Sequence, residues 1–250
     1  MAFLEHLDEL RKRIIRSLIA IAVGAAFAVL FINRLFDFLM APTRRVLPAD
    51  STLIYTQPGA VFALDMQLVV VAGTILAAPY VMFQVWRFIA PGLYANEKRF
   101  AIPFVTLSTA GLVAGAAFNH YVLFSSAMAF FASFDRPGLK FLPSVDDVFS
   151  LYTKMLIAMA LTFQMPTIVF FLARMRVVTA RWLARNIKYA ILLIFILAAV
   201  LTPSGDPFNQ TLFAAPMIAL YLLSIVVAWL AAPSGAASAT TSRTTESTRG

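Results

Sequence analysis

The sequence contains no cysteine, and charged side chains make up only 13% of its 250 residues. The absence of cysteine excludes disulfides, thiolate zinc sites, cysteine-ligated iron–sulfur clusters and cysteine nucleophiles. The charged fraction is about half that of an ordinary soluble domain, so polar surface is too scarce to cover a water-soluble globule of this length. A soluble enzyme, a disordered regulator and a nucleic-acid-binding domain all fit this composition poorly.

The common motifs of catalytic and cofactor-binding sites are also missing. The chain has no glycine-rich phosphate loop followed by lysine, no H-E-x-x-H pair and no G-x-S-x-G elbow. Its two histidines, His6 and His120, are far apart in the sequence, and an interfacial hydrogen bond is the simplest role for each. We therefore expect a protein that is not an enzyme and that holds no metal or other cofactor.

Apolar residues are abundant: 61% of the chain is hydrophobic, and the mean hydropathy is +0.83. A helix needs roughly 20 apolar residues to cross the hydrocarbon core of a bilayer. Six stretches meet or nearly meet this requirement, at 14–32, 64–86, 101–124, 149–173, 187–201 and 208–230. The sequence thus predicts an all-α, polytopic membrane protein with six transmembrane helices in one domain (1–232). The small, polar residues 233–250 are expected to form a disordered tail.

The net charge of +8 has an explanation in this topology. If the N-terminus lies in the cytoplasm, the cytoplasmic segments hold 14 of the 20 lysines and arginines. The positive-inside rule then places both termini in the cytoplasm, with the chain in the cell (inner) membrane and the lipid bilayer as its surroundings. The first apolar run lacks a small-residue cleavage site after it and is expected to be a retained helix. No nucleic-acid partner is needed to explain the basic excess.

One of the six apolar runs is short for a membrane span, and two outer segments between the runs are long. The run 187–201 rises only about 22 Å, against about 30 Å of hydrocarbon. Flanking residues are drawn in, or the bilayer is locally thinned around the helix, or the true helix boundary lies a few residues away. The long outer segments 33–63 and 125–148 contain several prolines and are expected to be structured caps with short helices.

The N-terminal stretch 3–14 carries apolar residues at helical spacing and acidic residues, including Glu9, on its other faces. Two interpretations stay open. The stretch is an amphipathic helix lying at the inner interface, followed by topology-setting cations that begin with Arg11. Alternatively, Glu9 and its neighbours form a cytoplasmic docking surface.

The first inner loop, 88–100, has an apolar, aromatic surface that includes Phe88 and Leu93, and Glu97 is its only acidic residue. Glu97 either pairs with a neighbouring cation, provides a helix N-terminal charge, or receives a cationic ligand. A carboxylate can bind a guanidinium through two hydrogen bonds.

Polar residues in or beside the later apolar runs form a third group. Gln164 places an amide at membrane depth, directly before the kink expected at Pro166. It either joins neighbouring helices or lines a polar cavity. Asp206 is a candidate cap for the sixth helix, and Gln210 lies where it could bond a neighbouring helix.

Four segments resemble the TatC family of the twin-arginine protein translocase. They are FLEHLDELRKR at the start, YVMFQVWRFIAPGLYANEKR after the second apolar run, the QMP kink, and LTPSGDPFNQTLFAAPM. Their order and spacing match over Phe3 to about Trp229, and the combination is specific although each segment alone is weak. No internal repeat is present, which disfavours the alternative of a small secondary transporter or channel subunit.

The resemblance implies a core receptor that binds twin-arginine signal peptides of folded cargo proteins and exports them using the proton motive force. It implies association with single-span TatA- and TatB-type subunits and self-association in a multimeric complex. In this family, Glu9 and Glu97 match the signal-binding acids, and Arg11, Phe88 and Leu93 fall on the same surface. Residues matched to assembly or to sensitive outer positions are Pro42, Gln164, Asp206 and Gln210.

One departure concerns the residue before the kink. Where the family usually has glutamate, this chain has Gln164, a neutral amide that costs less to bury than an ionised acid. An amide can bond a polar partner, but it cannot supply a negative charge or titrate.

Overall fold

The computed structural model describes residues 3–47, 53–55, 57–89, 101–134, 136, 141–201 and 206–231. Over these ranges the chain is helical and forms no β-strand, although an isolated parallel bridge joins Ile54 to Ser144. The elements are, in chain order, α1 (Phe3–Val29), α2 (Ile32–Val46), α3 (Ala60–Ile89), α4 (Ala101–Phe118), the π-helix η3 (Asn119–Leu123), α5 (Phe124–Ala132), α6 (Val145–Thr162), α7 (Met165–Arg174), α8 (Ala180–Arg185), α9 (Ile187–Leu201) and α10 (Pro207–Ala231). The predicted all-α class is confirmed.

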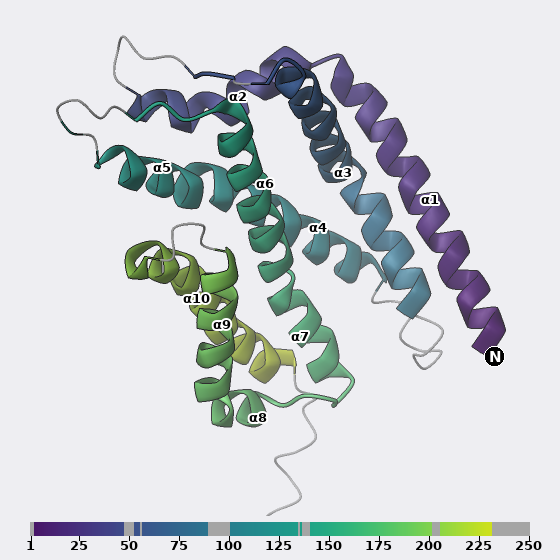
Figure 1. The fold of residues 1–250 in the computed structure, drawn as a ribbon. Coiled ribbons are helices and arrows are strands. Elements are labelled where there is room, and N and C mark those ends of the chain that lie inside the picture. The colour runs from purple at the N-terminus through teal and green to yellow at the C-terminus, as the bar shows by residue number, and fades with distance from the viewer. Residues whose placement is uncertain are drawn as a thin grey trace, which may run out of the picture.

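Helices α1 and α3 lie side by side along the right-hand edge of the molecule (Figure 1). Glycines let their backbones touch. A Cβ placed on Gly73 would lie 2.4 Å from the backbone nitrogen of Ala25, and one on Gly24 would lie 2.7 Å from the carbonyl oxygen of Gly73. Only residues without a side chain allow this approach, so the crossing fixes how the two helices are aligned.

The N-terminal stretch is not a separate interfacial helix. It forms the first turns of α1, which runs without a break from Phe3 to Val29. Good helix formers fill positions 3 to 16, and neither glycine nor proline occurs before Gly24, so nothing there ends the helix. The helix predicted over 3–14 is confirmed, but it is continuous with the first apolar run and is not a separate element.

Helix α2 lies at the end of the molecule opposite the N-terminus (Figure 1) and is bent by 88° from α1. It confirms the short helix expected in the outer segment 33–63. The second outer segment differs from the prediction, because the third apolar helix continues through η3 and α5 to Ala132. The next helix begins at Val145, where Ser144 caps it by accepting a hydrogen bond from the Asp147 backbone N–H.

The fourth apolar run is broken where the sequence predicts a kink. Helix α6 ends at Thr162, and α7 begins at Met165 with Pro166 in its first turn. Proline lacks a backbone donor and its ring clashes with the preceding turn, so it is tolerated at a helix start but not in the interior. Phe163 and Gln164 form the break.

Helix α9 has the bounds that the apolar pattern predicts, Ile187–Leu201, and contains 15 residues. These bounds support the interpretation that the helix itself is short. Its neighbour α10 has 25 residues and packs against it. In a bilayer, the lipid or the flanking residues must adjust to the short helix.

Four described helical segments are long and apolar enough to cross a membrane: Ala60–Phe88, Ala101–Ala132, Val145–Arg174 and Pro207–Ala231. The bent pair α1 and α2 raises this number to five if it is one span, and α9 is a shorter apolar helix. Large apolar side chains such as Val200 and Ile102 are more than three-quarters exposed, as expected for contact with lipid. The molecule is a multi-pass membrane protein.

Candidate functional site

The first candidate site lies where the start of α1 meets the end of α3. His6, Glu9 and Arg13 are spaced by three and four residues, so they share one side of α1. The His6 ring stacks on Phe88 near the end of α3, with ring centroids 4.5 Å apart and an interplanar angle of 20°. This side of α1 therefore faces α3.

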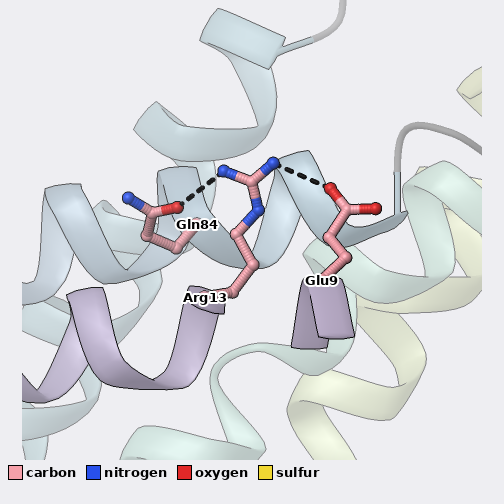
Figure 2. Close-up of polar contacts among 3 residues, drawn as sticks. All are labelled: Glu9, Arg13 and Gln84. Carbon is pink, nitrogen blue, oxygen red and sulfur yellow. Dashed lines mark hydrogen bonds and ion pairs between the residues drawn. The ribbon is translucent and has the colours of Figure 1, made fainter. Parts of the chain in front are cut away.

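Arg13 joins the two helices through its guanidinium (Figure 2). Its Nη2 donates to Glu9 Oε1 at 2.8 Å, and its Nη1 donates to Gln84 Oε1 at 3.1 Å. The Arg13 side chain is 13% exposed and that of Glu9 21% exposed, whereas Gln84 is almost fully buried. The Glu9 carboxylate is thus half-enclosed, near the surface, and paired with a cation of its own helix.

An open hollow of about 370 Å³ lies on the same part of α1. It is lined by three acids and three cations: Glu5, Asp8, Glu9, Lys12, Arg13 and Arg16. Acids precede cations along the helix, so the hollow has a negative side toward the N-terminus and a positive side toward the membrane-spanning part. Such an arrangement suits a ligand that presents guanidinium groups to the acidic side.

The other residues predicted for this site do not all lie beside Glu9. Phe88 lies beside His6 and so belongs to the α1–α3 end. Arg11 is exposed and two residues from Glu9, which turns it about 200° around the helix, away from the Glu9 carboxylate. Leu93 and Glu97 lie outside the described residues.

Gln164 connects helices. Its Nε2 donates to the Ser108 carbonyl oxygen of α4 at 2.9 Å. Gly111 allows this approach, because a Cβ there would lie 2.9 Å from the carbonyl oxygen of Phe163. Of the two interpretations of Gln164, the structure supports the one in which the amide joins neighbouring helices.

Asp206 and Gln210 anchor the start of α10. Asp206 accepts hydrogen bonds from the backbone N–H of Asn209 at 2.8 Å and from its side-chain amide at 2.9 Å, which is the geometry of an N-cap. Gln210 donates to the Phe195 carbonyl oxygen of α9 at 3.0 Å. The predicted cap and the predicted contact with a neighbouring helix are both confirmed.

Pro42 is buried within α2, next to the fully buried Thr43. It lies in the helix that follows the 88° bend, far along the molecule from Glu9. The residues grouped by family resemblance therefore fall into separate regions: the α1–α3 end, the α4–α6 contact, the α9–α10 hairpin and α2.

Sequence reasoning misses two members of the α1–α3 site, Arg13 and Gln84. It treats Arg13 only as a topology-setting cation, although a position four residues after Glu9 is the spacing of a helical ion pair. Gln84 is an amide in an otherwise apolar run, the same signal that marks Gln164. Among the described residues, no group of three or more metal-ligating side chains comes together.

Comparisons with known proteins agree with one another. The family model described as Sec-independent protein translocase protein (TatC) matches residues 5–216. The TatC protein of Koribacter versatilis (strain Ellin345) is 39% identical over 238 residues, covering 93% of this chain and 87% of the relative. That of Desulforapulum autotrophicum is 38% identical over 224 residues, covering 90% of this chain and 83% of the relative.

A solved structure, described as the crystal structure of the twin-arginine translocase receptor TatC, has the same fold. It superposes with a TM-score of 0.78 at 33% identity and covers 90% of this chain and 99% of the crystallised chain. The chain therefore belongs to the TatC family and is a core component of the Sec-independent, twin-arginine protein translocase.

Proposed function

We propose that this chain is the receptor for twin-arginine signal peptides and that it binds them at the α1–α3 end. The observation that carries the proposal is the Glu9 carboxylate, which is held near the surface beside the acidic side of the hollow. A planar guanidinium pairs with a carboxylate through two parallel hydrogen bonds, which lysine cannot reproduce. The solved relative is itself described as a receptor.

The remaining site residues extend this surface. Glu97 supplies a second carboxylate for the second arginine, and Phe88 and Leu93 offer apolar contact to the hydrophobic part of the signal. Arg11, exposed on another side of α1, contributes to the docking of the bound precursor rather than to the carboxylate itself. The stacking of Phe88 on His6 supports its place on this surface.

The membrane arrangement is part of the proposal. Six helices cross the cell membrane, and both termini are cytoplasmic, which puts the α1–α3 end where precursors arrive. The excess of lysine and arginine on that side supports this orientation. The protein carries out no chemistry of its own, and export is driven by the proton motive force.

Partner subunits complete the translocase. Single-span TatA- and TatB-type helices dock near α9 and α10, and further copies of this chain assemble beside it. The Gln210–Phe195 and Gln164–Ser108 hydrogen bonds support a role in assembly, because they fix the helices on which partners would lie. Pro42 and Asp206 act on the outer side through the placement of α2 and α10.

The test is photo-crosslinking of a labelled signal peptide to the full chain in membranes. We expect the peptide with two arginines to crosslink strongly and its Lys-Lys counterpart weakly. Glu9→Gln and Glu97→Ala should both reduce crosslinking and export. Asp37→Asn is the control, because Asp37 is an exposed acid on α2 that pairs with Arg44 away from the site. Undiminished crosslinking and export in the Glu9 and Glu97 variants would refute this binding site.

A further inference from the structure

The Glu9 carboxylate already has a guanidinium partner, and it comes from the same helix. Arg13 follows Glu9 by four residues and bonds one of its two carboxylate oxygens at 2.8 Å. An arginine of the ligand that binds Glu9 therefore has to displace Arg13 from the carboxylate. We propose that Arg13 is an internal competitor that occupies Glu9 in the resting protein and is displaced by an arginine of the signal. This inference rests on the proposed function, since it specifies what occupies that site before the ligand binds.

The resident pair is weaker than the pair that replaces it. Arg13 divides its donors, giving Nη2 to Glu9 and Nη1 to Gln84, so it offers Glu9 one hydrogen bond instead of the two-bond fork (Figure 2). Its Nε is buried without a hydrogen-bond partner among the described residues. An incoming arginine can use both donors of its fork on Glu9, which gives a shorter and stronger contact.

Lysine gains less from Glu9 than arginine does, because an ammonium group is a point charge that gains no fork geometry at a carboxylate. The cost of displacing Arg13 is the same for either ligand, so it raises both Kd values by one factor and leaves their ratio unchanged. Arg13 therefore sets an affinity threshold, which the two-bond contact of an arginine exceeds more easily than the contact of a lysine.

Gln84 fixes the position of the Arg13 guanidinium. Gln84 is almost fully buried on α3, 71 residues from Arg13 in the sequence, and its amide oxygen holds the guanidinium between the two helices. When the ligand takes Glu9, Arg13 keeps this second partner and does not become an unpaired half-buried charge. The displacement is therefore reversible and leaves α1 and α3 in contact.

The experiment measures peptide binding to the purified full chain in nanodiscs, with Arg-Arg and Lys-Lys signal peptides. We expect Arg13→Gln to lower the Kd of the Arg-Arg peptide roughly two- to fivefold, the range of a partly exposed ion pair. The Kd of the Lys-Lys peptide should fall by the same factor, because the cost of displacing Arg13 is common to both ligands. Gln84→Leu should instead raise both Kd values, because it leaves both Arg13 donors available to Glu9 and removes the partner that Arg13 keeps after displacement.

Lys12→Gln is the matched control. It removes the same charge from the next residue of α1, on the rim of the same hollow, without touching the Glu9–Arg13 pair. It should lower both Kd values by a smaller factor than Arg13→Gln does, and this effect should fade at high salt. An unchanged or higher Kd in Arg13→Gln, or an equal decrease in Lys12→Gln, would overturn the inference. If the wild-type protein binds the Arg-Arg and Lys-Lys peptides equally, the proposed function itself fails. The wild-type Kd values are therefore measured before those of any variant.

Discussion

At the residue scale, the neutral side-chain amide of Gln164 acts as a hydrogen-bond donor. Its Nε2 donates to the Ser108 carbonyl oxygen across the α4–α6 contact. An ionised glutamate could not take this role, because a carboxylate only accepts hydrogen bonds and cannot bond a carbonyl oxygen. In this chain, α4 is joined to the α6–α7 break by an amide, whose hydrogen bond does not depend on protonation of the side chain.

This role predicts that one of two variants responds to pH and the other does not. Gln164→Leu should lower the free energy of unfolding by about 0.6–1.5 kcal/mol at any pH, the typical value of one hydrogen bond between membrane helices. Gln164→Glu should lower it more at neutral pH and recover at low pH, because only the protonated acid can donate to Ser108. The folded state of that variant binds its proton more tightly than the unfolded state, so its stability falls as pH rises.

Thermal unfolding of the purified variants between pH 5 and pH 8 is the measurement. Gln67→Leu is the control, since Gln67 is an exposed amide on α3. A Gln164→Glu variant with wild-type stability across this range would show that the amide donor contributes nothing.

At the element scale, the α1–α3 pair is built on a close backbone crossing. Gly24 and Gly73 leave no space for a Cβ, and the atoms that a new Cβ would meet belong to the backbone of the opposite helix. Backbone atoms cannot rotate away as a flexible side chain can. Any residue larger than glycine must therefore separate the two helices, and with them Arg13 and Gln84.

Gly73→Ala should destabilise the protein by about 1–3 kcal/mol, the usual cost of overpacking a close contact. It should also weaken binding of the Arg-Arg peptide, because the α1–α3 site depends on the spacing of these helices. Melting temperature and peptide Kd measure the two effects. Gly59→Ala is the control, since a Cβ there would meet nothing within 4 Å. Equal melting temperatures for the two variants would contradict the account of the crossing.

At the scale of the whole molecule, the structure separates the proposed binding end from the α2 end. The start of α1 and the end of α3 lie together, and α2 lies at the opposite end (Figure 1). We propose, from the distribution of lysine and arginine in the sequence, that the first end faces the cytoplasm. This orientation can be tested directly by thiol labelling. Because the sequence has no cysteine, a single introduced cysteine would be the only thiol that reacts.

Phe134 follows α5 and Val177 follows α7, and both side chains are more than half exposed. In intact cells, Phe134→Cys should react with a membrane-impermeant maleimide. Val177→Cys should react only after the membrane is opened. The fraction of labelled protein on a gel measures this. The reverse pattern would invert the topology and move the proposed binding site to the wrong side of the membrane.

Much of the fold could be predicted because its signals are local. The bounds of α9, the break before Pro166, the Asp206 cap and the Gln210 contact all follow from a few neighbouring residues. Two helices extend further than the apolar pattern predicts, for a local reason. Neither glycine nor proline occurs between Phe3 and Gly24 or between Phe118 and Ala132, so α1 begins early and α4 continues through η3 into α5.

The sequence by itself determined that this is a helical membrane protein, because the lengths of the apolar runs and the positions of the prolines decide where spanning helices form and break. Its four motif segments indicated the resemblance to TatC, and the positions of its few acidic residues indicated the candidates for binding a cationic ligand. Only the tertiary structure decided that Glu9 is already paired with Arg13 and that Arg13 is held by Gln84. That pairing depends on the alignment of α1 with α3, which the contact between Gly24 and Gly73 sets and no local pattern reveals.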